Sequence, residues 1–219
     1  MNIERLTENG KGRRKYDSPT RRDQAEATRA RIAEAARRVF VERGWTATRV
    51  RDVAAEAGVS EASVFAIHGN KAGLAKALVD SVDLSADIPR LVSELKEAEG
   101  DPGAQIAAMV GMDRRLFESG SDLITLMQEA QRSDPDVAAA YVEGRSRGDE
   151  SRRRMFATWP KKAFLEGVTA ESARDVYAAM CNVDVYRVLT EERGWDADRV
   201  EQWWHESLVR LLLAEDDQP

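Results

Sequence analysis

The spacing of helix-breaking residues constrains the fold of this 219-residue chain more than any other feature of its sequence. Glycine and proline divide the chain into segments of helical length, and within these segments apolar residues recur three or four positions apart. Alternating runs of β-branched residues, which are typical of strands, are few. The pattern predicts an all-α protein with about nine helices and no convincing strand.

Capping residues and breakers set the limits of these helices. Asn70 and Thr169 are suited to cap the helices that follow them, Asp198 and Glu201 have the spacing of a capping box, and Pro89 predicts a kink. The predicted helices cover about 24–44, 49–57, 60–67, 70–100, 101–120, 121–132, 133–159, 170–193 and 196–213.

Three residues near position 60 have the spacing of a helix-turn-helix. Ala54 is small enough for two helices to pack closely, Gly58 tolerates the positive φ of a tight turn, and Val64 fills the angle between the helices. Ser60 is placed to cap the second of them. The spacing alone is common in helical proteins, so the surrounding sequence decides what it means.

The formal net charge of −6 conceals a strong asymmetry along the chain. Residues 1–51 carry 14 Lys and Arg against 7 Asp and Glu, whereas the rest of the chain carries 19 against 32. A basic end on an acidic body indicates a polyanion partner for that end, and a merely solvated charged tail is the alternative. Residues 1–23 lack apolar periodicity and are predicted to be a flexible basic arm, with Arg13, Arg14, Lys15, Arg21 and Arg22 available to DNA.

Several classes of protein lack support in the sequence. Cys181 is the only cysteine, and with His68 and His205 it falls short of a metal-binding motif, so we expect neither a disulfide nor a metal. The chain has no Ser/His/Asp grouping and no phosphate loop, so we expect no enzymatic activity and no cofactor. It also has no run of about 18 apolar residues and no apolar leader, which predicts a cytoplasmic protein.

The segment RVRDVAAEAGVSEASVFAIHGNKAGLAKAL, preceded by a helix ending in FVERGW, closely resembles the DNA-binding domain of TetR-family transcriptional regulators. The resemblance covers residues 28 to about 80. It implies a homodimeric repressor that binds a palindromic operator and is released by a small-molecule effector. We therefore expect the arm at 1–23, a DNA-binding domain at 24–80, and an effector-binding and dimerisation domain at 81–219.

The resemblance also implies the residues that contact DNA. Arg51 lies at a position that touches a base or phosphate, Lys71 matches a phosphate-binding lysine, and Ala62 can contact only apolar groups such as a thymine methyl. Many relatives have a tyrosine where this chain has Phe65, and His68 is interpreted as either a structural residue or a phosphate contact. The predicted contacts are Arg49, Arg51, Ser60, Ala62, Ser63, Phe65, His68 and Lys71.

Two further sets of residues are predicted in the C-terminal part, where the family binds its effector and pairs its last helices. For each residue, ordinary packing in the chain's own core is the alternative. The predicted effector pocket comprises Met109, Met112, Phe117, Met127, Met155, Phe156, Trp159, Tyr177 and Met180. The predicted dimer interface comprises Val176, Val183, Tyr186, Trp204, Leu208 and Leu211.

A second function stays open beside the repressor. The predicted third helix carries one charged residue, Glu61, and that charge is negative. A protein of the same architecture that senses a ligand or binds a protein partner, but binds operator DNA weakly or not at all, would have such a helix.

Overall fold

The structure is a computed structural model and describes residues 19–214, without the side chains of 19–22 and 81–85. The helices of the N-terminal part are α1 (Pro19–Arg43), α2 (Val50–Ala57), α3 (Glu61–His68), α4 (Lys71–Ser85) and α5 (Ile88–Glu97). Those that follow are α6 (Pro102–Ala130), α7 (Pro135–Ala157), the 3₁₀ turn η1 (Lys161–Ala163), α8 (Ala170–Met180), α9 (Val183–Arg187), the π-helical turn η2 (Val188–Glu192) and α10 (Ala197–Leu212). The predicted all-α class is confirmed.

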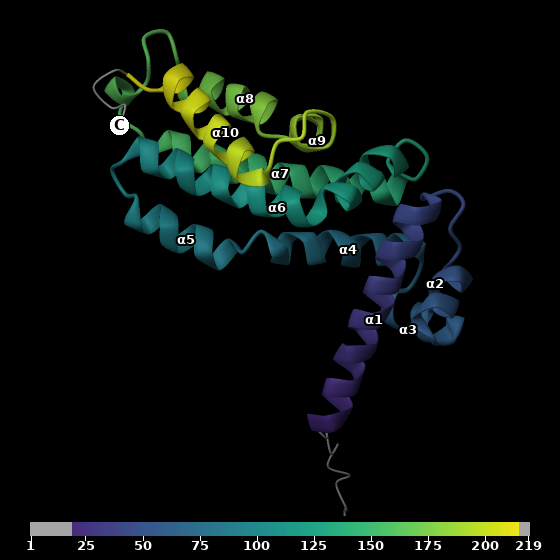
Figure 1. Cartoon of the computed structure of the whole chain (residues 1–219). Coiled ribbons are helices and arrows are strands. Elements are labelled where there is room, and N and C mark those ends of the chain that lie inside the picture. Colours follow the sequence, from purple (N-terminus) through teal and green to yellow (C-terminus); the bar gives the residue numbers. More distant parts are fainter. Residues whose placement is uncertain (1–18, 215–219) are drawn as a thin grey trace, which may run out of the picture.

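The helices form two groups. Figure 1 shows α1, α2 and α3 at one end of the molecule, with α1 projecting away from the rest. In the larger group α4 and α5 lie along one side of α6, and α8 and α10 lie on the other side of α6 and α7. Within residues 19–214 the extended backbone makes only an isolated bridge, between Phe164 and Leu213. None of the described helices is long and apolar enough to cross a membrane.

The first helix begins earlier than the sequence predicted. α1 starts at Pro19 instead of Gln24, so the predicted flexible arm is wrong for residues 19–23. Proline suits this place because the first turn of a helix needs no backbone N–H from it. The rest of the arm, including Arg13, Arg14 and Lys15, lies outside the described residues.

The predicted long helix over 70–100 is two helices. The chain breaks at Asp87, whose φ of 53° lies in the left-handed region, and its carboxylate accepts a hydrogen bond from the backbone N–H of Arg90 at 3.3 Å. Pro89 therefore lies in the first turn of α5, where proline is tolerated, and does not kink a continuous helix.

The opposite error concerns α6, which was predicted as two helices meeting at Gly120. One helix of 29 residues runs through that glycine, which is buried. Contacts with α1, α4, α5, α7 and α10 surround α6, and this packing outweighs the roughly 1 kcal/mol by which glycine disfavours a helix interior.

The last two predicted helices also need correction. The segment 170–193 breaks after Met180, and Asn182 starts α9 by accepting a hydrogen bond from the N–H of Val185 at 3.0 Å. The cap of α10 is Asp196, which accepts from the N–H of Arg199 at 2.7 Å. The predicted capping box from Asp198 does not form, because its carboxylate accepts from Arg114 instead, at 2.7 Å.

Two hydrophobic cores lie along the molecule, and one of them joins its two groups of helices. The distal core lies among α5–α10 and includes Met109, Phe156, Tyr177 and Trp204. The joining core, as we call it here, combines residues of α1–α4 with Leu123, Leu126, Met127 and Ala130 of α6 and Val137 of α7. Its N-terminal members are Ile32, Ala35, Ala36, Val39, Phe40, Trp45, Val53, Ala54, Val64, Leu74, Ala75 and Leu78.

A polar contact reinforces this junction. The guanidinium of Arg37 in α1 donates through Nη2 to the backbone oxygen of Ser119 at 2.6 Å and to Oδ1 of Asp122 at 2.8 Å. Its Nε donates to Oδ2 of Asp122 at 3.1 Å. The two-pronged pairing fixes the orientation of α1 on the middle of α6.

Candidate nucleic-acid interface and ligand cavity

The turn between α2 and α3 has the geometry of a helix-turn-helix. Gly58 has a φ of 65°, and the N–H groups of Gly58 and Val59 donate to carbonyls of the last turn of α2 at 3.2 and 3.0 Å. Ala54 and Val64 are buried at the contact between the two helices. The roles predicted for Ala54, Gly58 and Val64 are confirmed by this geometry.

The outer face of α3 is formed by small and apolar residues. Glu61, Ala62, Phe65 and Ala66 are exposed, and Phe65 leaves 47% of its surface in solvent. Together with Ala62 and Ala66, Phe65 gives this face apolar surface for contact with a partner.

The two serines of this region are hydrogen-bonded to each other. Ser60 Oγ accepts from the backbone N–H of Ser63 at 3.1 Å, which confirms Ser60 as the helix cap, and the two hydroxyls lie 2.9 Å apart. A hydroxyl can still accept a second bond in this arrangement, but neither one is free of internal partners.

Lys71 begins α4 and lies against aromatic rings. Its ammonium donates to the backbone oxygen of Trp45 and lies 4.3 Å from the centre of the Trp45 ring and 5.8 Å from that of Phe40. Burial lowers the pKa of Lys71, an effect that the nearby carboxylate of Asp134 opposes. Lys71 thus has a place in the fold besides the phosphate contact predicted for it.

The remaining predicted contacts differ in exposure. Arg49 and Arg51 are exposed at the start of α2, and the backbone N–H of Arg49 donates to Asp52 at 2.9 Å. His68 is half-buried, and its Nε2 is buried without a hydrogen-bond partner among the described residues. Burial, followed by the charge of Arg29, lowers the pKa of His68.

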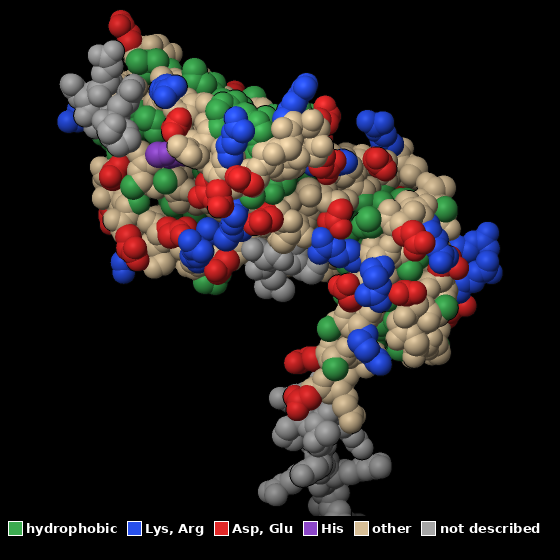
Figure 2. Space-filling view, viewed as in Figure 1, with side chains coloured by type: hydrophobic (Ala, Val, Ile, Leu, Met, Phe, Trp, Pro, Cys, Tyr) green, Lys and Arg blue, Asp and Glu red, His purple; other side chains and the backbone are tan. Residues whose placement is uncertain are grey.

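The charge of this end of the molecule is mixed. Figure 2 shows Lys and Arg side chains over the end formed by α1 and α2, with Asp and Glu among them. Arg38 pairs with Glu34 and Glu56, both at 3.1 Å, and Arg43 lies 3.7 Å from Asp52.

A cavity of about 800 Å³ lies among α4, α5, α6 and α7, next to the N-terminal group. Its wall combines Phe40 and Trp45 of the N-terminal group with apolar residues of α4, α5 and α6 and a polar stretch of α7. Of the nine residues predicted for an effector pocket, Met112, Phe117 and Met127 line it. The others pack in or against the distal core: Met109, Met155, Phe156, Trp159, Tyr177 and Met180.

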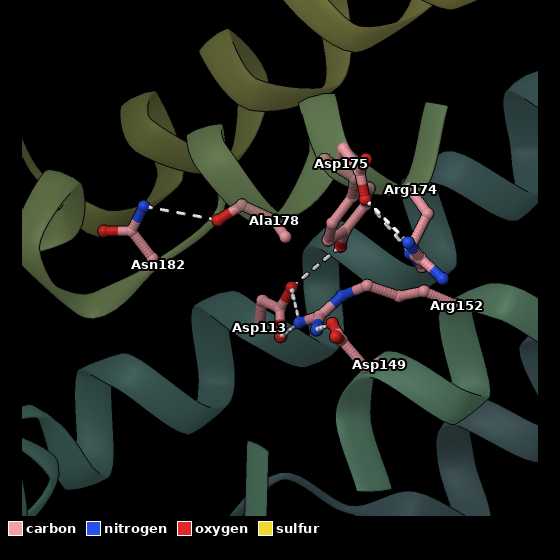
Figure 3. A network of polar contacts seen from close by, with 8 residues as sticks. Asp113, Asp149, Arg152, Arg174, Asp175, Ala178 and Asn182 are labelled. Atoms are coloured by element: carbon pink, nitrogen blue, oxygen red, sulfur yellow. Dashed lines mark hydrogen bonds and ion pairs between the residues drawn. The ribbon is translucent and has the colours of Figure 1, made fainter. Parts of the chain in front are cut away.

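A buried ion pair lies at the wall of the cavity (Figure 3). Asp113 of α6 is fully buried, and Nη2 of Arg152 in α7 donates to both of its oxygens at 3.2 Å. The hydroxyl of Tyr177 in α8 donates to Oδ2 of Asp113 at 2.8 Å, and Asp149 lies 3.6 Å from Nη1 of Arg152. Both oxygens of the buried carboxylate are therefore occupied.

This network changes the proton affinities of its members. Burial, helped by the charge of Asp113, raises the pKa of both Tyr177 and Cys181 well above their ordinary values, so both are protonated at neutral pH. Burial opposes the charge of Arg152, but Asp113 and Tyr177 outweigh it and hold its pKa above the usual value. The network was missed in the sequence, where the one available signal was a carboxylate within the apolar run IAAMVGMDRRLF.

Most residues predicted for a dimer interface are buried within the chain itself. Val183, Tyr186, Trp204 and Leu208 belong to the distal core, and Val176 packs against it. Leu211 of α10 is 48% exposed, and large apolar side chains are also exposed at Trp203 and Val188.

The fold and the site together define an all-α protein with an N-terminal helix-turn-helix domain and a cavity beside it. Residues 32–78 match the family of bacterial regulatory proteins, tetR family. The match covers the helix-turn-helix and the parts of α1 and α4 that pack on it.

Two relatives are similar to this chain over part of its length. The HTH-type transcriptional regulator TtgR of Pseudomonas putida is 41% identical over 81 residues, which are 37% of this chain and 38% of that protein. The uncharacterized HTH-type transcriptional regulator YvkB of Bacillus subtilis is 39% identical over 74 residues, or 34% of this chain and 36% of that protein. The chain thus spans less than two fifths of the length of these relatives.

Solved structures share the fold over most of this chain. NalD, the secondary repressor of the MexAB-OprM multidrug efflux pump in Pseudomonas aeruginosa, superposes with a TM-score of 0.70 at 22% identity, over 87% of this chain and 99% of that one. A transcriptional regulator from Saccharomonospora viridis in complex with choline has a TM-score of 0.67 at 20% identity, over 87% of this chain and 100% of that one. At these identities the likeness is one of fold.

Proposed function

We propose that this protein is a cytoplasmic, ligand-responsive homodimeric repressor, which binds a palindromic DNA operator and leaves it when a small molecule fills the cavity. The α2–α3 helix-turn-helix carries this proposal, because its left-handed turn at Gly58 and its exposed α3 face form a unit that fits the major groove. The family of residues 32–78 supports it.

Two kinds of residue would contact DNA at this interface, those that bind phosphates and those that contact bases. The exposed Arg49 and Arg51, and Lys71 at the start of α4, supply charge for phosphates. The exposed Ala62 and Phe65 supply apolar contact, for which the thymine methyl group is the partner in the major groove. Ser60 and Ser63 add hydroxyl groups, which are hydrogen-bonded to each other.

The position of the cavity supports control by a ligand. Phe40 and Trp45 are part of the joining core and also of the cavity wall, and Lys71 rests on the Trp45 ring. A ligand that repositions these aromatic residues changes the placement of the helix-turn-helix, and two such units in a dimer then cease to fit two successive grooves together.

Dimerisation is proposed through the outer face of the C-terminal helices. Trp203 and Leu211 of α10 and Val188 of η2 are large apolar side chains left exposed in one copy of the chain. Pairing of this face between two copies would bury them.

Footprinting of the purified protein on DNA directly upstream of its own gene tests the proposal. We expect a protected region with two-fold symmetry and an affinity that falls steeply with salt, because phosphate contacts release counterions. Absence of protection on any fragment of a random genomic library would reject operator binding.

The lack of a cationic side chain on the exposed face of α3 favours one other function. A helix-turn-helix of this kind could instead hold a protein partner while the cavity senses a ligand. The two functions differ in salt dependence, which is shallow for a protein partner and steep for DNA.

A further inference from the structure

The charges around the cavity are balanced. The described residues that line it include four arginines and four carboxylates, all on α7 except Asp113 on α6. The charged members are Asp113, Glu143, Arg145, Arg147, Asp149, Glu150, Arg152 and Arg154. The rest of the described lining is mostly Leu, Ile, Val, Ala, Met and Phe, so apolar surface dominates and no excess of either charge faces the cavity.

The most buried charges at the cavity wall, Asp113 and Arg152, pair with each other. Asp113 is fully buried and holds Arg152, whose side chain is only 12% exposed, while the hydroxyl of Tyr177 occupies one of the same carboxylate oxygens. Glu150, at the outer end of this stretch, is held by Arg153 and Arg154 at 2.7 and 2.8 Å. These Arg153 and Arg154 contacts lower the pKa of Glu150 to about 2, so it remains charged and paired.

We propose that the cavity takes an uncharged, largely apolar small molecule, and that the Asp113–Arg152 pair rejects organic acids and organic amines of the same shape. The proposal rests on the proposed function only in taking the cavity as a ligand site. It concerns what the site accepts, whether or not binding there releases DNA.

The reason is the cost of an unmatched charge in a buried place. A carboxylate ligand would have to share Arg152 with Asp113 and Asp149 and place a third negative group beside one guanidinium. An ammonium ligand would have to share Asp113 with Arg152 and would repel that guanidinium. Burying an ion without its own partner is strongly unfavourable, whereas an uncharged molecule loses none of these contacts.

Three probes with one shape and different charge test the proposal: biphenyl-4-methanol, biphenyl-4-carboxylate and biphenyl-4-methylamine. Calorimetric titration of the full-length protein at neutral pH should give the alcohol an affinity on the order of 10-fold or more above both ions. Tighter binding of the acid or the amine would overturn the proposal. Failure of all three to bind at millimolar concentration would overturn it as well.

Two substitutions should invert the preference. Asp113→Asn leaves Arg152 with only the exposed carboxylate of Asp149, so the affinity for the acid should rise relative to that for the alcohol by on the order of 10-fold. Arg152→Gln leaves the buried carboxylate of Asp113 with only the neutral hydroxyl of Tyr177, so the relative affinity for the amine should rise instead. The double variant Asp113→Asn with Arg152→Gln restores a neutral pair and should again prefer the alcohol.

The matched control is Arg153→Gln, which removes an arginine of the same helix that is 57% exposed and does not line the cavity, while Arg154 still holds Glu150. It should keep the wild-type order of affinities. If a single variant does not fold, as judged by circular dichroism, the affinities of the wild type and the double variant for the three probes still test the proposal. An unchanged order in both folded single variants would overturn the proposal, whereas a protein that binds the alcohol but protects no DNA contradicts only the proposed function.

Discussion

At the scale of single residues, Lys71 shows how one side chain can serve both the fold and a ligand. Its ammonium lies over the Trp45 ring and donates to the Trp45 carbonyl, which leaves further N–H groups free because an ammonium has three. The same group can therefore contact a phosphate without leaving the tryptophan. A lysine held in this way loses less conformational freedom when it binds DNA.

Replacing Lys71 by Ala should weaken binding to all DNA sequences alike, by about 1–3 kcal/mol per dimer, because a phosphate contact carries no sequence information. The slope of affinity against salt should also become shallower. Fluorescence anisotropy with specific and random duplexes measures both. The control is Lys76→Ala, which removes an exposed lysine of the same helix. Equal affinity of wild type and Lys71→Ala would remove Lys71 from the interface.

His68 should make the protein sensitive to mild acid. Burial places its pKa in the folded state below the ordinary 6.5, so the unfolded chain takes up the proton first as the pH falls. The free energy of unfolding should therefore decline as the pH falls through about 6.5, until the lowered pKa of the folded state is also passed.

Urea unfolding of His68→Gln and wild type at about pH 7.5 and pH 5.5 measures this effect. The variant should lose less stability between the two values, since it has no imidazole to protonate. An equal loss in both proteins would show that His68 is not the source of the acid sensitivity.

Residues that act through neighbours in the sequence were predictable, and those that act across the fold were not. Ser60 caps a helix that begins at the next residue, so its role can be inferred from the local sequence. Asp113 meets Arg152 and Tyr177 from 39 and 64 residues away. Nothing in the local pattern distinguishes that arginine from others on the same helix, because the pairing depends on how α6, α7 and α8 pack.

At the scale of elements, packing decided where local signals misled. Gly120 predicted a helix break but lies buried inside α6, whereas Asp87 gave no signal and yet ends a helix through a left-handed backbone. Glycine is a reliable breaker only when it takes a positive φ, as it does at Gly44, Gly58 and Gly194. The sequence ERGW occurs at 42–45 and again at 192–195, and its glycine has a positive φ in both places.

Two glycine substitutions should have opposite effects on stability for this reason. Gly58→Ala should destabilise the protein by about 1–2 kcal/mol, because its φ of 65° is unfavourable for a residue with a Cβ. Gly144→Ala in α7 should stabilise it by about 0.5–1 kcal/mol, because the new Cβ would meet a methyl of Val79 at 3.9 Å without a clash. Urea denaturation of both variants gives the two values. The same sign for both would contradict this explanation.

At the scale of the whole molecule, the hydrophobic core continues across the domain boundary expected near residue 80. The joining core takes Phe40, Val64 and Leu74 from the N-terminal part and Leu123 and Met127 from α6. Motifs located the segment that matches the tetR family, residues 32–78, but they contain no information on which later helix covers it.

Leu123→Ala should test this continuity. Leu123 is 2% exposed in the joining core, so its truncation should cost about 2–5 kcal/mol. Because the core is shared, tryptophan emission and circular dichroism should shift to lower urea together and still coincide. Two separated transitions would show that the parts unfold independently.

The joining core has a consequence for protein engineering. A chimera that grafts residues 24–80 onto another sensor would present the underside of α1 and α4 to a foreign helix in place of Leu123, Leu126 and Met127. It would also leave Arg37 without Asp122 and the carbonyl of Ser119. A working exchange should therefore carry the middle of α6 along with the helix-turn-helix, so the transferable part is discontinuous in sequence.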